Sequence, residues 1–159
     1  MADGQGIKIV EQGGVLHLSG VLNEYTDLSS LLAMAEPLRL NIQMVSRFNS
    51  IGIRNLLKFL AIWGNKAFSF ERCPSEFIDQ INMIPALLGT KGHGEIKSLY
   101  VPYECVSCDH EEDVLGTLDE YRDGVGGGSW PVRACGKCGN NMTMLTDSFF
   151  VFLSRGNPL

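Results

Sequence analysis

The sequence predicts an α/β fold, a mixed sheet with helices on one face, followed by a small zinc ribbon with four cysteine ligands. Several short segments alternate apolar and polar residues, which is typical of strands, and between the later ones apolar residues recur with helical spacing. Four of the five cysteines form two Cys-x-x-Cys pairs in the last third of the chain. Hydrophobic residues make up 45% of the 159 residues, enough to exclude a wholly disordered chain.

Alternation with period two is clearest in two segments, Val15–Leu22 and Leu38–Val45, whose apolar residues share one face. Gly13 and Gly14 precede the first of these segments, and such a pair between alternating segments predicts a hairpin. Shorter strands are predicted at three further places: Ile7–Glu11, Ala67–Arg72 and Glu95–Val101.

Three segments repeat apolar residues with helical spacing and are bounded by residues that start or end helices. The predicted order is β-β-α-β-α-β-α-β, which fits a sheet backed by helices on one face. The helical segments run from Leu28 to Ala35 behind Asp27, from Ser50, as N-cap, to Gly64, and from Ser75 onward with a break at Pro85.

The balance of acidic and basic residues changes near residue 102. Residues 1–102 carry nine acids and nine bases, whereas residues 103–140 carry eight acids and three bases, a net charge of −5 (three minus eight). This change predicts two domains, residues 1–102 and residues 103–159. The second would hold the ribbon and a C-terminal aromatic segment, Phe149–Leu153, which could pack on the ribbon, on the first domain or in a dimer.

The two Cys-x-x-Cys pairs are the strongest chemical signal. Each pair can hold a metal from a tight turn, and two pairs complete the tetrahedral shell of thiolates that suits zinc. Gly139 follows the second pair, where such a turn favours positive φ, and Asp109 takes the same place after the first. Four thiolates close the shell, so we predict one structural zinc per chain, bound by Cys105, Cys108, Cys135 and Cys138.

The same four cysteines allow interpretations other than a zinc site. Iron in this shell would make a rubredoxin-like electron carrier, whereas disulfides are disfavoured in a reducing compartment. The sequence shows neither a signal peptide nor a long apolar run, so we expect a cytoplasmic protein without membrane attachment. A nucleic-acid-binding ribbon is disfavoured because its acidic surface would repel phosphates. His110 is interpreted as a loop residue outside the metal shell.

The first domain resembles the STAS domain, the module of anti-sigma-factor antagonists and sulfate-transporter tails. The resemblance covers about residues 6 to 102 and rests on three segments: Gly14–Leu22, Leu38–Val45 and Phe48–Arg54. It implies a mixed sheet backed by helices and a function in binding protein partners. In the antagonist branch the partner is a serine/threonine switch kinase, which phosphorylates a hydroxyl residue in the turn before a helix.

The turn in this chain matches the antagonist pattern in part. Asn49 stands where the pattern has an acid, Ser50 fills the first hydroxyl position, Ile51 replaces the second, and Gly52 matches. The resemblance therefore implies a phosphorylation or partner site at Ser50, Asn49, Gly52 and Arg54. A phosphate at a helix N-terminus is physically favourable, although Ser50 as a simple N-cap is the more economical interpretation.

Outside the cysteine pairs, we find no nucleophile–base pair, carboxylate pair or dinucleotide motif in the sequence. Cys73 is expected to be a buried, unreactive thiol, and His17 and His93 are not assigned a chemical role. We therefore predict a non-enzymatic regulatory module that binds a protein partner and carries a structural zinc. The rubredoxin-like carrier and a nucleic-acid-associated ribbon protein are the alternatives.

Overall fold

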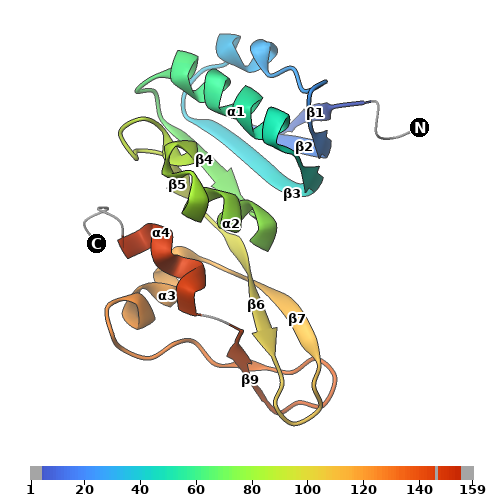
Figure 1. Ribbon diagram of the computed structural model, residues 1–159, viewed down its shortest axis with the longest axis vertical. Coiled ribbons are helices and arrows are strands. Elements are labelled where there is room, and N and C mark those ends of the chain that lie inside the picture. The colour runs from blue at the N-terminus through green and yellow to red at the C-terminus, as the bar shows by residue number, and fades with distance from the viewer. Residues whose placement is uncertain (1–4, 146, 155–159) are drawn as a thin grey trace.

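Two β-sheets follow each other along the long axis of the molecule in the computed structural model, which describes residues 5–145 and 147–154 (Figure 1). The first sheet has the order β1-β2-β3-β4-β5; β1 and β2 are antiparallel and the other pairs are parallel. The fold is therefore mixed α/β, as predicted. Its strands are β1 (Ile7–Gln12), β2 (Val15–Leu22), β3 (Leu38–Phe48), β4 (Phe68–Glu71) and β5 (Glu95–Ile96).

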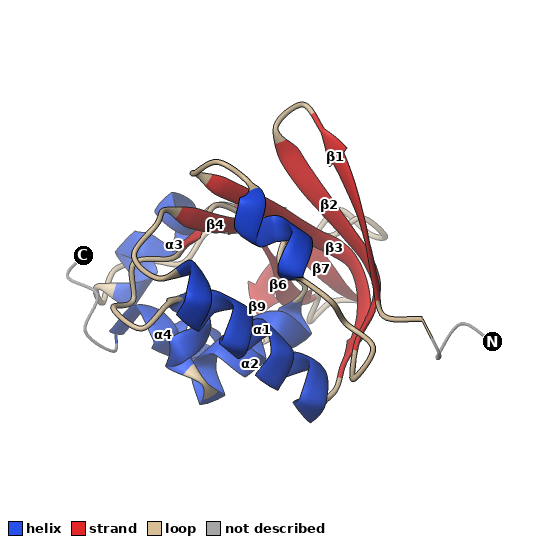
Figure 2. Ribbon diagram, turned by 90° about the horizontal axis from the view of Figure 1, so that it is seen from above, coloured by secondary structure: helices blue, strands red, loops and turns tan. Residues whose placement is uncertain are grey.

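Two helices, α1 (Ser50–Trp63) and α2 (Ser75–Met83), lie on the same side of this sheet (Figure 2). Gly64 ends α1 with a φ of 72°, as the sequence predicted, because an L side chain rarely adopts this conformation. Pro85 begins a separate 3-10 helix, Pro85–Leu88, and so breaks the third helical segment where expected.

The segment predicted as a helix from Leu28 to Ala35 is a 3-10 helix, Ser29–Ala33. Asp27 accepts a hydrogen bond from the backbone N–H of Ser29 at 2.9 Å, so it does stabilise the start of the turn. Leu31 is the one residue of this helix that is buried, and so short a segment gains too little packing to extend into an α-helix.

The second sheet is antiparallel throughout and has the order β7-β6-β9-β8. Two short helices accompany it, α3 (Leu118–Val125) and α4 (Val151–Ser154), the latter preceded by a 3-10 turn at Asp147–Phe150. Its strands are β6 (Leu99–Glu104), β7 (Glu111–Gly116), β8 (Arg133–Ala134) and β9 (Asn141–Met144).

The single strand predicted from Glu95 to Val101 is two strands, β5 and β6, in two different sheets. At this change Cys73 forms an isolated parallel bridge to Leu99, in which its N–H donates to the C=O of Ser98 at 3.1 Å and its C=O accepts from the N–H of Tyr100 at 2.9 Å. The chain thus passes to the second sheet at residues 97–98, ahead of the domain boundary predicted after Pro102.

The aromatic segment Phe149–Leu153 packs against both units and joins them. The side chain of Asn82, on α2, donates to the C=O of Phe149 at 3.0 Å and accepts from the N–H of Phe152 at 2.8 Å. On the other side the Phe150 ring stacks on Tyr121 of α3, with ring centroids 4.8 Å apart. Figure 1 shows α4 between α2 and α3, so the first two of the three predicted placements both apply.

Within the described residues, none of the helices has the length and apolar character needed to cross a membrane. The apolar side chains instead form one continuous core that runs through both units.

Candidate metal centre

The four cysteines lie in two similar turns at the same end of the second sheet. Cys105 and Cys108 occupy the turn from β6 to β7, and Cys135 and Cys138 the turn from β8 to β9. In each turn the first cysteine donates its N–H to the residue five positions later, from Cys105 to His110 at 2.8 Å and from Cys135 to Asn140 at 2.7 Å.

The residue after each pair has a positive φ, as the sequence predicted. The φ angles are 58° at Asp109 and 80° at Gly139, and both N–H groups donate back to the C=O of the first cysteine in their pair. Asparagine and aspartate tolerate this conformation better than other non-glycine residues, which explains the difference between the two turns.

The two turns bring all four Sγ atoms within 4.8 Å of one another. Cys105 and Cys138 approach to 3.5 Å, and Cys108 and Cys135 to 3.7 Å. A tetrahedral site with metal–sulfur bonds of about 2.3 Å has sulfur–sulfur edges of about 3.8 Å, so this cluster has the size of such a site. The four predicted ligands are thus brought together, and they can hold one metal ion.

Backbone N–H groups favour the thiolate form of the first cysteine in each pair. Burial opposes ionisation of Cys105, but N–H groups of Cys108 and Ser107 outweigh it and lower the pKa of Cys105 to about 7. The N–H of Cys138 chiefly lowers the pKa of Cys135. Thiolates this close repel each other, so a cation is needed for all four to be ionised together.

A carboxylate joins the two turns to each other. Glu112, on β7, accepts a hydrogen bond from the N–H of Gly136 at 3.1 Å, and its other oxygen lies 3.8 Å from the His110 Nε2. Cys105 and Cys135 are 1% and 4% exposed, whereas Cys138 lies at the surface. His110 is not part of the cysteine cluster, as expected.

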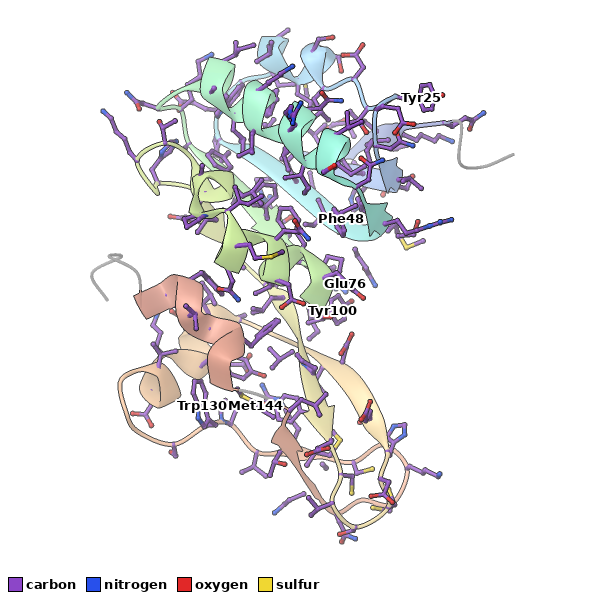
Figure 3. The ribbon with its side chains drawn as sticks, in the orientation of Figure 1. Tyr25, Phe48, Glu76, Tyr100, Trp130 and Met144 are labelled. Carbon is purple, nitrogen blue, oxygen red and sulfur yellow. The ribbon has the colours of Figure 1, made fainter. Side chains whose placement is uncertain are left out.

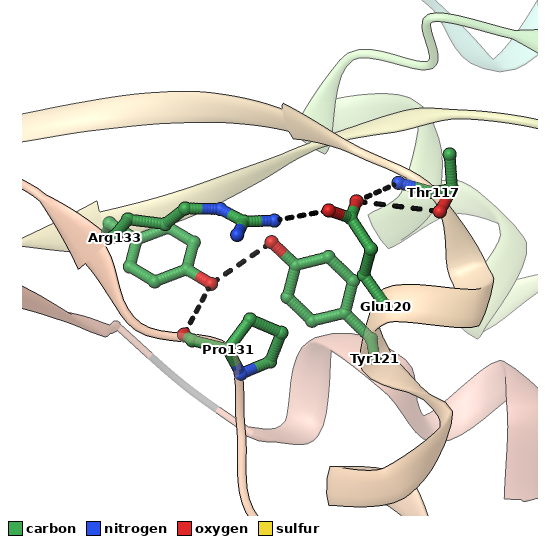
Figure 4. Close-up of polar contacts among 6 residues, drawn as sticks. Thr117, Glu120, Tyr121, Pro131 and Arg133 are labelled. Atoms are coloured by element: carbon green, nitrogen blue, oxygen red, sulfur yellow. Dashed lines mark hydrogen bonds and ion pairs between the residues drawn. The ribbon is translucent and has the colours of Figure 1, made fainter.

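A polar network in the second unit holds α3 against the strands, as Figure 4 shows. The hydroxyls of Tyr103 and Tyr121 lie 3.0 Å apart, and Tyr103 donates to the C=O of Pro131 at 3.1 Å. Burial raises the pKa of Tyr103, so this phenol stays protonated and able to donate.

The other part of Figure 4 is a capping box at the start of α3. Glu120 accepts from the N–H of Thr117 at 2.7 Å and pairs with Arg133 at 3.0 Å. The hydrogen bond from the Thr117 N–H contributes most to lowering the pKa of Glu120. Helix α3 was not predicted from the sequence, although Thr-x-x-Glu ahead of a helix is a recognisable capping signal.

At the start of α1 the N-cap is Asn49, so the assignment of Ser50 as N-cap was wrong. The Asn49 side-chain oxygen accepts from the N–H of Gly52 at 2.8 Å, and its amide donates to Glu24 at 3.0 Å. An N-cap side chain accepts a hydrogen bond from the N–H two or three residues beyond it, so this bond identifies Asn49 as the N-cap, one residue before Ser50. Ser50 is the first helical residue and lies exposed.

Gly52 is required at its position because the helix meets a neighbouring strand there. A Cβ atom at Gly52 would lie 2.0 Å from the C=O oxygen of Leu22, the last residue of β2. The first turn of α1 and the loop after β2 also carry exposed side chains: Ile51 is 46% exposed, Arg54 lies at the surface, and Tyr25, labelled in Figure 3, is 60% exposed. We call Tyr25, Asn49, Ser50, Ile51 and Arg54 the α1 entry surface.

Two residues without an assigned role are placed by the structure. Cys73 is fully buried, and burial raises its pKa well above the ordinary value, as expected of an unreactive thiol. The His93 ring packs edge-on against Phe68 at 5.3 Å, and its two nitrogens have no hydrogen-bond partner among the described residues.

Comparisons with protein-family models, with curated proteins and with solved structures give no significant match. The interpretation of both sites therefore depends on their residues and geometry.

Proposed function

We propose that this protein is a non-enzymatic regulatory module that binds a protein partner through the α1 entry surface and carries a structural zinc ion. The observation that carries the proposal is the exposure of Tyr25 and Ile51 beside a rigid helix start. Large apolar side chains beside an arginine are the groups that contribute most to protein–protein contacts.

Rigidity supports this role of the α1 entry surface. The Asn49 side chain links the helix to Glu24 and to its own first turn, and Gly52 lies directly against β2. A surface that is ordered before binding loses less conformational entropy on association. The resemblance to STAS domains suggests a serine/threonine kinase as the partner, with Ser50 as the hydroxyl within its reach.

Partner capture with paired variants tests the surface. Ile51→Glu places a charge on the α1 entry surface, whereas Ile62→Glu makes the same change on the same helix, at a residue that is 70% exposed. The two sites are separated by about 16 Å along α1. Wild type and I62E should retain the same protein from cell extract, and I51E should lose it. Equal retention by both variants would refute the placement.

Phosphorylation is tested on the same captured protein. Intact-mass spectrometry followed by peptide mapping should place any phosphate on Ser50, and Ser50→Ala should abolish it. Protein that binds its partner through Ile51 but carries no phosphate would be a constitutive module without a phosphorylation switch.

The zinc assignment rests on the size of the thiolate cluster and on its closed shell. Four thiolates leave no coordination position for a substrate, so the metal would stabilise the fold. Native mass spectrometry should find one zinc per chain. Iron with visible absorption would instead support the rubredoxin-like carrier. Removing the zinc should unfold the second sheet, because metal binding and folding are coupled in such sites.

A further inference from the structure

A cleft of about 430 Å³ lies where the two units meet. Its lining residues come from β5 of the first sheet, from the first turn of α3 and from α4. Figure 1 shows where these three elements lie in the molecule. Its volume falls within the range of roughly 300–1,000 Å³ that is usual for ligand sites. Its apolar lining comes from five residues: Leu88, Ile96, Leu118, Phe152 and Leu153.

The backbone of β5 is bonded on one side. β5 is the last strand of its sheet and pairs with β4, where the N–H of Lys97 donates to the C=O of Phe70 at 2.8 Å. Successive residues of a strand turn their backbone groups to opposite sides, so Lys97 and Glu95 face β4. The N–H and C=O of Ile96 therefore face away from β4, and Ile96 is one of the residues that line the cleft.

These two groups of Ile96 lack a partner although the residue is buried. Ile96 is 6% exposed, and its N–H and C=O have no hydrogen bond to any of the described residues. Buried backbone groups are almost always paired, by the protein, by water or by a ligand. The cleft thus presents one donor and one acceptor at the spacing of a strand edge.

Charges on the two walls cancel. On the β5 side Lys97 pairs with Glu95 at 2.5 Å, and on the α3 side Arg122 pairs with Asp119 at 2.8 Å. A phosphate or another strongly charged ligand would therefore find no net opposite charge in the cleft. Its lining suits an uncharged group, and its backbone pair suits another main chain.

We propose that this cleft binds an extended, uncharged segment of a protein partner, which adds to the first sheet as a strand beside β5. Main-chain hydrogen bonds to Ile96 supply the strand pairing, and an aliphatic side chain of the segment packs on Leu118 and Phe152. This is strand addition at an open sheet edge, in which side-chain pockets select the sequence. The site is separate from the α1 entry surface and requires both units.

Peptide titration of the full-length, isotope-labelled protein tests the proposal. The probe is a capped Thr-Val-Thr-Val-Thr peptide, and the control is the same peptide with every backbone nitrogen methylated. The parent peptide at millimolar concentration should shift the Ile96 amide signal in a saturable way and slow its hydrogen exchange. The methylated peptide should bind at least about tenfold more weakly, because its backbone cannot donate hydrogen bonds. No shift at Ile96, or equal binding of both peptides, would overturn the proposal.

Proline variants test the backbone assignment in the protein itself. Ile96→Pro removes an N–H that β4 does not use, so the fold should remain and parent peptide binding should weaken about fivefold or more. Ile96→Val keeps the N–H and should bind as the wild type does. Lys97→Pro removes the bond to Phe70 and should destabilise the sheet. Full peptide binding by a folded I96P protein would contradict the proposed hydrogen bond.

Discussion

Asn82 is the residue on which the docking of the C-terminal segment depends most directly. Its side-chain amide makes two hydrogen bonds to the backbone of that segment, at 3.0 Å to Phe149 and at 2.8 Å to Phe152. Asn82→Ala removes both bonds and leaves a C=O and an N–H unpaired at the junction. Neutral hydrogen bonds contribute about 0.5–1.5 kcal/mol each, so we expect a loss of about 1–3 kcal/mol in the free energy of unfolding.

Urea unfolding combined with amide exchange measures this effect. The N82A variant should unfold at lower urea with an unchanged slope, and exchange of the Phe152 N–H should accelerate. Asn82→Asp keeps an acceptor for Phe152 but loses the donor to Phe149. It should therefore protect the Phe152 amide better than N82A does.

Asn55→Ala serves as the matched control, because Asn55 makes a single bond of 3.3 Å to the C=O of Asn23, far from this junction. It should leave exchange at Phe152 unchanged. An N82A variant that matches the wild type in both stability and Phe152 exchange would show that aromatic contacts alone hold the segment, and would refute the role of Asn82.

Three further predictions concern other contacts. Gly52→Ala should lower the free energy of unfolding, measured in urea, by about 1–3 kcal/mol, because the added Cβ would lie 2.0 Å from the Leu22 oxygen. Gly126→Ala is the control and should be close to neutral, because the atom nearest to its Cβ would be 3.6 Å away. Phe150→Ala should lower the free energy of unfolding by about 3–5 kcal/mol and expose the α3 surface to a hydrophobic dye. An unchanged urea midpoint would show that the Phe150 ring does not stabilise the core. Partial burial raises the pKa of Asp113 above the ordinary carboxyl value, and the negative charge of Glu76 raises it further. The folded protein therefore opposes ionisation of Asp113, and the free energy of unfolding falls as the pH rises from the ordinary carboxyl range through the raised pKa. The melting temperature of Asp113→Asn should thus exceed that of the wild type at neutral pH but not in acid. Glu111→Gln removes the same charge on the same strand and is the matched control.

Local pattern was sufficient for most of the first sheet and for the metal ligands. Strand β2 begins and ends where alternation predicts, because one of its faces is buried and the side-chain period of a strand is two. The cysteine turns were predictable for a similar reason. With two residues between them in a tight turn, the thiols of each pair converge through local backbone geometry alone, and Gly139 marks that geometry.

The end of the first sheet was not predictable from local pattern. The segment Glu95–Val101 was predicted as one strand, although two adjacent polar residues, Lys97 and Ser98, interrupt its alternation, and its two halves, β5 and β6, belong to different sheets. Alternation reports that a segment is extended and has one buried face, but not which strand lies beside it. The N-cap of α1 likewise required the structure, since Asn49 and Ser50 are both good capping residues and only geometry selects one.

Short-range periodicity and spacing are enough to establish a mixed α/β unit, a four-cysteine cluster and an aromatic segment near the end of the chain. Three other features emerge only from the folded molecule: the aromatic segment joins the two units, Asn82 holds it, and a cleft with an unpaired strand edge lies between β5 and α3. Such features bring together residues far apart in the chain, and their contact energies depend on three-dimensional packing that no local pattern records.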